Sequence, residues 1–244
     1  MADYRVIACE VFKEELLLGL SVPAEKCLFL PQGLHRTPDQ LGVELQKAID
    51  QLDEEGGIDR IYLGYGLCGN GVAGVKSCRS RLVIPDSEDC IPVLHGLPGV
   101  GQGRAIDRIT SYYLSHGWIA YGKDGWKEYE RCLTIFDQET AYWCVKEMLK
   151  HYKRFTLIDT GMLSHAEDQA YTHKVSTFFG LEDGETQGSL DWLESLLRED
   201  PAFNLTVLPG VALETRLFAV NRESGGDTAG KGLDKSLSQA GGKG

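Results

Sequence analysis

Short apolar runs rich in β-branched residues alternate with helical patterns along most of this chain, and this alternation limits the fold more than any other feature. The runs occupy residues 4–9, 26–31, 58–66, 81–86, 155–161 and 203–210. Parallel strands need a crossover connection, and segments with helical spacing separate most of these runs. The order therefore predicts an α/β fold, a doubly wound, Rossmann-like and mostly parallel sheet with helices on both faces.

The helical segments carry clear start and stop signals. In residues 37–57, Thr37 stands at the N-cap position, Pro38 opens the first turn, and glycine ends the segment. Apolar residues recur between them at a spacing typical of a helix that covers a sheet. Further helices are predicted over residues 10–20, 137–152, 166–180 and 189–200.

The length of 244 residues allows one large core or two small ones. We expect a single α/β domain over residues 1–221, which could divide into two halves near residue 125. From Arg222 onward the chain is mostly glycine, serine and lysine with little to bury. Residues 222–244 are therefore predicted to form a disordered tail.

Charge excludes several classes of partner. The formal net charge is -11, and no cluster of lysine and arginine stands out, so the field repels nucleic acid and anionic membranes. The first twenty residues lack the basic flank and cleavage site of a signal peptide, and no apolar segment is long enough to span a bilayer. We expect a soluble, cytoplasmic protein that binds neither nucleic acid nor membrane.

The cysteines do not form a local zinc motif. There are seven, an odd number that argues against a disulfide framework in a reducing compartment, and none forms a CxxC pair. Cys27, Cys132 and Cys144 lie within strand or helix patterns and are assigned to core packing. Any metal site must therefore be assembled from separate loops.

Residues 62–74, "YLGYGLCGNGVAG", place five glycines and Cys68 directly after a strand. Gly64, Gly66 and Gly69 match the G-x-G-x-x-G pattern of dinucleotide sites, and Asp86 follows about twenty residues later. A phosphate also needs a helix N-terminus behind the glycines, and the next residues are poor helix formers. Nucleotide binding stays open as an alternative.

A metal site is favoured by the position of the cysteines at strand ends. Cys9 ends the first strand, Cys68 follows the third and Cys90 the fourth, while His35 follows the second. The carboxyl ends of parallel strands share one edge, where such folds gather functional groups. Three thiolates and an imidazole suit zinc or iron. Simple core packing of these cysteines is the alternative.

Other residues are candidates for the surroundings of this site. They are Glu10, Asp89, Gly66, Gly69, Asn70, Tyr113, His116 and Trp118. Asp89 could orient a ligand or could cap a helix that begins at Cys90. The aromatic residues could line a substrate pocket or plug a sheet edge. In a third interpretation Cys68 is a nucleophile whose proton passes to His35 or His116.

Six segments resemble the domain of unknown function 1638 family. They occur in the order "CEVF", "LPQGLH", "YGLCGNGVAG", "LVIPDSEDCIPVLHG", "YYLSHGW" and "VLPG", from about residue 4 to about residue 212. Members of that family are soluble proteins of anaerobic bacteria and archaea, often encoded near corrinoid-dependent methyltransferases. Asp86 and Glu88 depart from the pattern, where an arginine and a histidine are expected, so no role for a histidine is carried over there.

Residues and resemblance together lead to one main expectation. A zinc or iron site would activate a small substrate as a Lewis acid. The resemblance implies a setting of one-carbon or corrinoid-dependent methyl transfer, with a small molecule or a corrinoid or methyltransferase protein as partner. A metal carrier or assembly factor, and a metal-free small-molecule binder, remain as alternatives.

Overall fold

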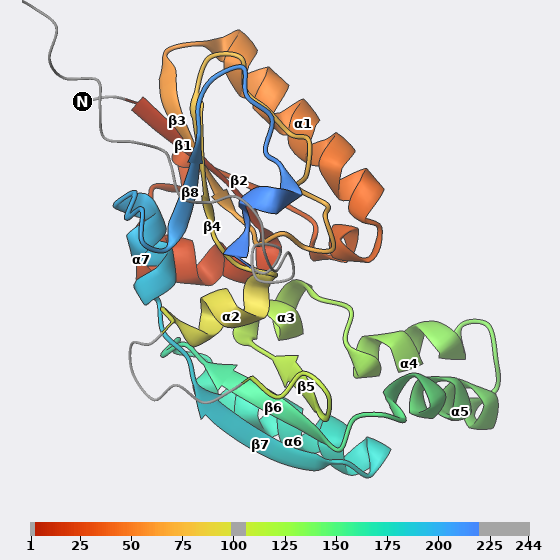
Figure 1. The fold of residues 1–244 in the computed structure, drawn as a ribbon. Helices are drawn as coiled ribbons and strands as arrows, with labels where there is room; N and C mark the ends of the chain where they lie inside the picture. Colours follow the sequence, from red (N-terminus) through yellow and green to blue (C-terminus); the bar gives the residue numbers. More distant parts are fainter. Residues whose placement is uncertain (1–2, 99–105, 220–244) are drawn as a thin grey trace, which may run out of the picture.

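The computed structural model describes residues 3–98 and 106–219, and within these ranges eight strands form two sheets (Figure 1). The first sheet has the order β2-β1-β3-β4-β8 and the second the order β5-β6-β7. The strands are β1 (Asp3–Cys9), β2 (Cys27–Leu30), β3 (Ile58–Gly64), β4 (Arg81–Pro85), β5 (Ser111–Leu114), β6 (Arg154–Asp159), β7 (Glu182–Gln187) and β8 (Asn204–Val207). Every described strand pair is parallel except β4–β8, which confirms the mostly parallel α/β prediction.

The helices lie between the strands in the expected order. They are α1 (Pro38–Glu55), α2 (Cys90–His95), α3 (His116–Tyr121), α4 (Gly125–Leu133), α5 (Gln138–Leu149), α6 (His165–Phe179) and α7 (Asp191–Leu197). A 3₁₀ helix, Gln32–Arg36, follows β2. The helix predicted over residues 10–20 is less regular, with a 3₁₀ turn at Glu10–Phe12 and a π-helical turn at Glu15–Gly19.

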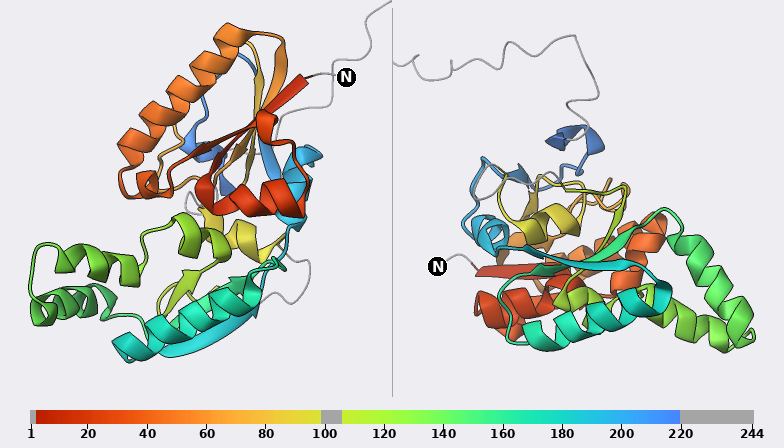
Figure 2. Two further views of the ribbon diagram at one scale, coloured as in Figure 1. Left: turned by 180° about the vertical axis from the view of Figure 1, so that it is seen from behind. Right: turned by 90° about the horizontal axis from the view of Figure 1, so that it is seen from below.

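Helices cover both faces of the first sheet, as the doubly wound pattern requires (Figure 2). On one face, Leu41, Leu45 and Ile49 of α1 pack against Ile7 and Ile61 of the sheet. These helix positions are three or four apart and so share one side of the helix. The opposite face packs against the 10–20 segment, α2 and α7. Strand β1 lies inside this sheet, between β2 and β3.

The second sheet contains two strands that sequence patterns do not reveal. Strand β5 lies in an aromatic segment that none of the predicted strands includes, and β7 has the polar sequence "EDGETQ". Strand β7 is at the sheet edge and pairs with β6, so half of its backbone and most of its side chains face solvent. The chain changes sheet between β4 and β5, ahead of residue 125.

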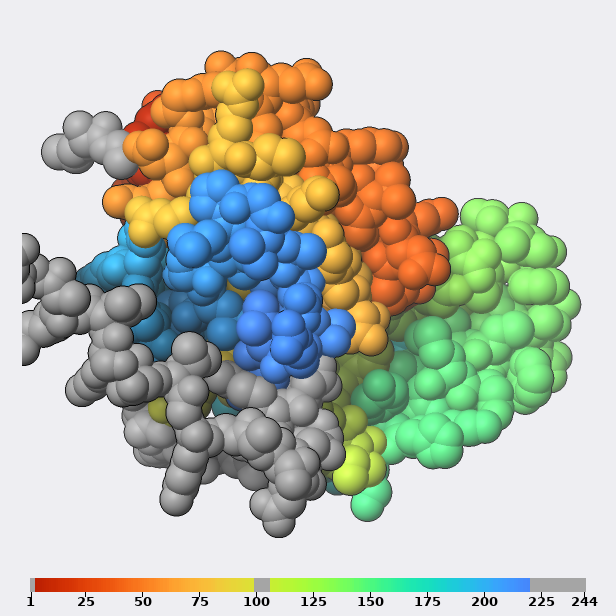
Figure 3. All heavy atoms as spheres, turned by 45° about the horizontal axis from the view of Figure 1, so that its top comes forward, coloured from red at the N-terminus to blue at the C-terminus, as the bar shows by residue number. Residues whose placement is uncertain are grey.

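After β7 the chain returns to the first sheet through α7 and β8. The segment that follows β8, dark blue in Figure 3, lies against residues 74–77. Gly74 donates to Leu213 over 2.8 Å, and Leu213 donates to Val75 over 2.9 Å. These bonds anchor the far end of the glycine-rich loop. The predicted tail, 222–244, lies outside the described residues, and in the described part of the chain no helix combines the length and apolarity needed to cross a bilayer.

Candidate functional site: a thiol-lined cavity at the sheet edge

The candidate site lies where β1 ends. Cys9 is the last residue of β1, and the neighbouring residue Ala8 is in register with Gly64, the last residue of β3. Because β2 and β3 lie on opposite sides of β1, the connections after β1 and β3 diverge around its carboxyl end. Ligands bind at this kind of switch point in open α/β sheets.

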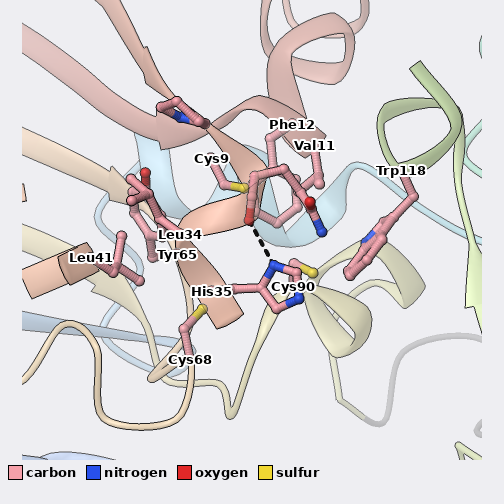
Figure 4. Close-up of a pocket in the computed structure, with 12 residues that line it drawn as sticks. Cys9, Val11, Phe12, Leu34, His35, Leu41, Tyr65, Cys68, Cys90 and Trp118 are labelled. Atoms are coloured by element: carbon pink, nitrogen blue, oxygen red, sulfur yellow. Dashed lines mark hydrogen bonds between the residues drawn. The ribbon is translucent and has the colours of Figure 1, made fainter. Parts of the chain in front are cut away.

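Cys9, Cys68, Cys90 and His35 line the same small cavity, together with Gln32, Tyr65, Trp118 and apolar side chains. We call it the thiol cavity. Figure 4 shows the three cysteines, His35, Tyr65 and Trp118 reaching the cavity from separate segments of the chain. Its volume is about 20 Å³, which is enough for one water molecule or one ion. The sequence predicted that these strand-end residues lie at one rim, and the structure places all four at one cavity.

Gly66 allows the loops that carry Cys68 and Cys90 to meet. A Cβ atom at position 66 would lie 2.6 Å from the backbone of Asp89, closer than real contacts allow. The approach is secured by two backbone bonds of 2.8 Å, from Leu67 to Ser87 and from Cys68 to Glu88. The first function of this glycine is therefore to let backbone approach backbone.

The backbone of the loop turns sharply at Cys68 itself. Cys68, Gly69 and Asn70 have φ values of 48°, 63° and 72°, all in the left-handed region. A non-glycine residue in this region is uncommon and costs free energy. Two non-glycine residues, Cys68 and Asn70, are held there on either side of Gly69 while the Cys68 thiol lines the cavity, so packing of the surrounding loop outweighs the local cost.

All three thiols of the cavity are poor acids in this environment. Burial raises the pKa of Cys9 to about 11 and that of Cys68 to about 12. Burial also raises the pKa of Cys90 well above its ordinary value. Repulsion from neighbouring thiolates adds to the effect at Cys68 and Cys90, since each would sit in the field of the Cys9 sulfur. The thiols are neutral at pH 7 unless a cation lies among them.

These pKa values bear on the nucleophile interpretation. A nucleophilic cysteine needs a lowered pKa, supplied by a nearby cation or a helix start. The backbone N–H of Gly66 favours the Cys68 thiolate, but burial and Cys9 outweigh it. The environment therefore weighs against a preactivated Cys68.

His35 is held in the form that binds metals. Its Nδ1 lies 2.6 Å from the carbonyl oxygen of Gln32, and a carbonyl only accepts, so Nδ1 carries the proton. Burial lowers the pKa of His35, which keeps the ring neutral and leaves a lone pair on Nε2. Backbone carbonyls fix metal-binding histidines in the same way. The Trp118 ring packs edge-on against the imidazole at 5.2 Å.

Besides the indole N–H of Trp118, polar atoms of Gln32 and Tyr65 line the cavity without hydrogen-bond partners among the described residues. Both atoms of the Gln32 side-chain amide and the hydroxyl of Tyr65 are buried and unpaired. Gln32 is 1% exposed and Tyr65 is 3% exposed. A buried group left unpaired costs about 1–3 kcal/mol. Both therefore favour a polar ligand in the cavity, and neither was among the predicted site residues.

Three sulfurs and one imidazole nitrogen are donor types that suit a soft metal, but in this structure the four atoms are too far apart to coordinate one ion. Around a zinc ion, sulfurs about 2.3 Å from the metal are roughly 3.8 Å apart. No three of the cavity's four donors lie within 4.8 Å of one another in the described structure, so binding requires the thiols to rotate inward. Asp159, His165 and Glu185 do satisfy that distance, but they are partly or fully exposed.

That second group is better described as an ion-paired histidine. His165 Nε2 lies 3.1 Å from Glu185 and 3.7 Å from Asp159. The hydrogen bond to Glu185 and the charge of Asp159 raise the pKa of His165. A histidine that is stabilised in its charged form competes poorly for a metal ion.

The other candidate residues are divided between the cavity and other places. Glu10 accepts a hydrogen bond of 3.1 Å from the backbone of Gln32 and so supports the segment that carries His35. Asp89 caps α2 by accepting from Ile91 over 2.8 Å, as the capping interpretation expected, and pairs with Arg108 over 2.6 Å. Tyr113 and Trp118 line a larger cleft beside the thiol cavity.

His116 and Asn70 lie outside the thiol cavity. His116 bonds to Glu14 and Asp168, and Asn70 lines a surface pocket beside α1. Although His116 is only two residues from Trp118, both are in α3, where two positions are about 200° apart around the helix axis. Proximity in the sequence was therefore a poor guide to the position of this side chain.

The dinucleotide pattern lacks the element that would bind phosphate. Residues 68–74 form turns, and the described chain reaches β4 without an intervening helix. The helix that directly follows the glycines in a dinucleotide site, and whose N-terminus binds the pyrophosphate, is therefore absent between Gly74 and β4. Asp86, the acidic residue of the pattern, accepts a hydrogen bond of 2.7 Å from the backbone of Ala219.

Comparison with known proteins gives one match. The model of a protein family described as "Protein of unknown function (DUF1638)" matches residues 29–197. This range includes His35, Cys68 and Cys90. No curated protein and no solved structure matches the chain.

Proposed function

The chain belongs to the DUF1638 family, and we propose that it binds a single zinc or iron ion through His35 and the three cysteines of the thiol cavity. The observation that carries the proposal is the convergence of four separated donors on a cavity of about 20 Å³. Core packing alone requires small apolar side chains. It does not require a neutral imidazole with a free Nε2 beside three thiols.

The unpaired polar groups support a site that is more than structural. Gln32 and Tyr65 present an amide and a hydroxyl to the same cavity. An ion bound there would deprotonate the thiols and supply a Lewis acid. The amide and hydroxyl would then hydrogen-bond the substrate atom that reaches the ion, because a cavity of about 20 Å³ has no room for a whole molecule beside it. An activating role on a small substrate follows, and the resemblance to the family suggests one-carbon or methyl-transfer metabolism as its setting.

The cavity volume limits how a corrinoid could take part. A space of about 20 Å³ admits an ion but no tetrapyrrole. If a corrinoid reacts here, it is carried by a partner protein and approaches from outside the thiol cavity. The proposal therefore predicts metal binding by the isolated chain without any corrinoid.

The test is elemental analysis of protein purified without oxygen, combined with cobalt substitution. We expect about one equivalent of zinc or iron per chain and intense thiolate-to-cobalt absorption after exchange. Cys9→Ser, Cys68→Ser and Cys90→Ser should each lose most of the metal. Cys78→Ser is the matched control, because Cys78 is exposed and lies outside the cavity.

Two results would contradict the proposal. One is native protein that contains no stoichiometric metal and takes up none on reconstitution under reducing conditions. The other is full metal content in all three cavity variants. An effect on activity that is confined to Cys68→Ser, with metal content unchanged, would instead support the nucleophile interpretation.

A metal carrier is the second candidate, and the spacing of the donors favours it. The thiols must rotate inward before they can share an ion, and protons compete strongly for each sulfur. A site that reorganises on loading can release its ion more readily than a rigid one. Rapid transfer of zinc to a chromophoric chelator, without unfolding, would favour the carrier over the enzyme.

A further inference from the structure

A larger cleft adjoins the thiol cavity and is lined by residues associated with both sheets. Its volume is about 370 Å³, within the usual range for small-molecule sites. It shares His35 and Trp118 with the thiol cavity, so these two side chains form the boundary between the two spaces. Residues of the 3₁₀ helix after β2 line one side, and residues of β5 and the end of α5 line the other.

Aromatic rings dominate the walls of this cleft. Tyr112, Tyr113, Tyr152 and Trp118 all line it. Tyr112 and Tyr152 pack edge to face at 5.2 Å, which fixes the orientation of both rings. Fixed aromatic faces stack on flat ligands at a low cost in side-chain entropy.

Two guanidinium groups line the cleft, and none of its lining residues carries a carboxylate. Arg108 is held by Asp89 at 2.6 Å and Glu88 at 3.2 Å, and Arg36 lies 3.8 Å from Glu128 and also bonds to the Lys123 carbonyl. Each guanidinium has five N–H donors, more than these contacts use. The acidic partners position the arginines, and the remaining donors can bind an anion.

We propose that this cleft binds a flat organic anion, an aromatic or heteroaromatic carboxylate, with its ring between the tyrosines and its carboxylate at Arg36 and Arg108. The shared wall at His35 and Trp118 would place the ring of the ligand beside the thiol cavity. The ligand class rests on the cleft alone. Its role as the molecule activated by the ion rests on the proposed function.

The test is equilibrium dialysis of the full chain with 4-hydroxybenzoate, with 4-hydroxybenzamide as the neutral analogue and acetate as the non-aromatic anion. We expect saturable binding of the aromatic carboxylate and at least tenfold weaker binding of the other two. Arg36→Gln and Arg108→Gln should each weaken the carboxylate about tenfold or more, because each removes charge-assisted hydrogen bonds. Arg198→Gln, at an exposed position at the C-terminal end of α7 and outside the lining of the cleft, should change nothing.

The same measurement is repeated with Cys68→Ser and with chelator-treated protein. Retained binding in these samples would show that the cleft binds the carboxylate without the metal. Absence of metal from the native protein would then contradict the proposed function and leave this inference intact. Equal binding of the amide and the carboxylate, or no binding of 4-hydroxybenzoate at millimolar concentration, would overturn it. Arg36→Lys provides a second variant if Arg108→Gln does not fold, and it should bind more weakly because it lacks the planar fork.

Discussion

Two histidines on neighbouring parts of this protein have opposite surroundings. His35 lies among thiols and aromatic rings, and burial lowers its pKa. His116 is clamped by Glu14 at 3.0 Å and Asp168 at 3.1 Å, and the Ser164 hydroxyl lies 2.7 Å from its Nδ1. Burial lowers the pKa of His116, but the two carboxylates outweigh burial and raise it.

The contrast shows which histidine is available for chemistry. Both ring nitrogens of His116 are used in ion pairs, so its free energy is lowest when it is charged. His35 uses one nitrogen and keeps the other free, so it is stable as a neutral ligand. Glu14, His116 and Asp168, which we call the carboxylate cluster, link the 10–20 segment of the first sheet to α3 and α6 beside the second sheet. The thiol cavity instead lies at the carboxyl end of β1.

The thiol cavity and the surroundings of His116 should differ most in how they affect the pH dependence of metal affinity. Since the pKa values of Cys9 and Cys68 are about 11 and about 12, each thiol must lose a proton when it binds an ion. Affinity should rise about tenfold per pH unit for each proton released, up to about a thousandfold for three thiols. Competition with a chromophoric chelator at pH 6, 7 and 8 measures the slope, and His116→Gln should not alter it.

The next largest effect concerns Glu15, which is completely buried beside the carboxylate cluster. Burial raises its pKa from 4.5 to about 7, although its Oε1 accepts a hydrogen bond of 3.1 Å from Thr160. A raised pKa means that this contribution to stability is complete below pH 4.5 and is lost as the pH rises through 7. The loss is about 3 kcal/mol.

Glu15→Gln removes this titration and keeps an acceptor for Thr160. Urea unfolding at pH 5 and pH 8 should show a smaller decrease in the free energy of unfolding for the variant than for the native chain. If both proteins lose the same free energy between these pH values, Glu15 does not titrate in that range in the folded state.

Gly66→Ala tests whether close backbone approach builds the thiol cavity. The new methyl group would meet the Asp89 backbone at 2.6 Å and force the two loops apart. We expect a loss of about 1–3 kcal/mol in the free energy of unfolding, together with loss of metal. Gly184→Ala is the control, because its nearest neighbour atom would lie at an ordinary 3.7 Å. Unchanged metal content in Gly66→Ala would show that the loop separation does not matter.

The smallest effect is expected for the clamp around His116. Its raised pKa means that the ion pairs stabilise the fold at pH 6 and that this stabilisation is lost as the pH rises through the folded-state value. His116→Gln should cost about 1 kcal/mol at pH 6 and less at pH 8. Metal content should not change. His173→Gln, an exposed histidine paired with Asp183, should alter stability at neither pH.

Much of the fold could be predicted from local patterns. The inner strands β1, β3 and β4 are apolar and β-branched because both of their faces are buried, and α1 is bounded by Pro38 and Gly56. The second sheet was harder to predict. Strand β7 is polar because it lies at an edge, and β5 has only four residues within an aromatic segment. Local patterns also do not show that the strands divide between two sheets.

The candidate site was partly accessible by the same reasoning. Cys9, Cys68, Cys90 and His35 could be grouped because the carboxyl ends of parallel strands meet at one edge. Gln32 and Tyr65 could not be assigned, because nothing in a linear sequence shows that a buried amide or hydroxyl lacks a partner. His116 was grouped with Trp118 only by sequence distance, and the helix separates them.

The succession of strands and helices along the chain, and with it the position of Cys9, His35, Cys68 and Cys90 at or after strand ends, was determined by the sequence alone, because hydrophobic periodicity is a local property of the chain. Tertiary structure decided which histidine keeps a free lone pair, which thiols stay protonated and which polar atoms remain unpaired. Those properties depend on burial and on charges contributed by residues far away in the sequence, as Asp168 is from His116. They arise only when distant segments pack together.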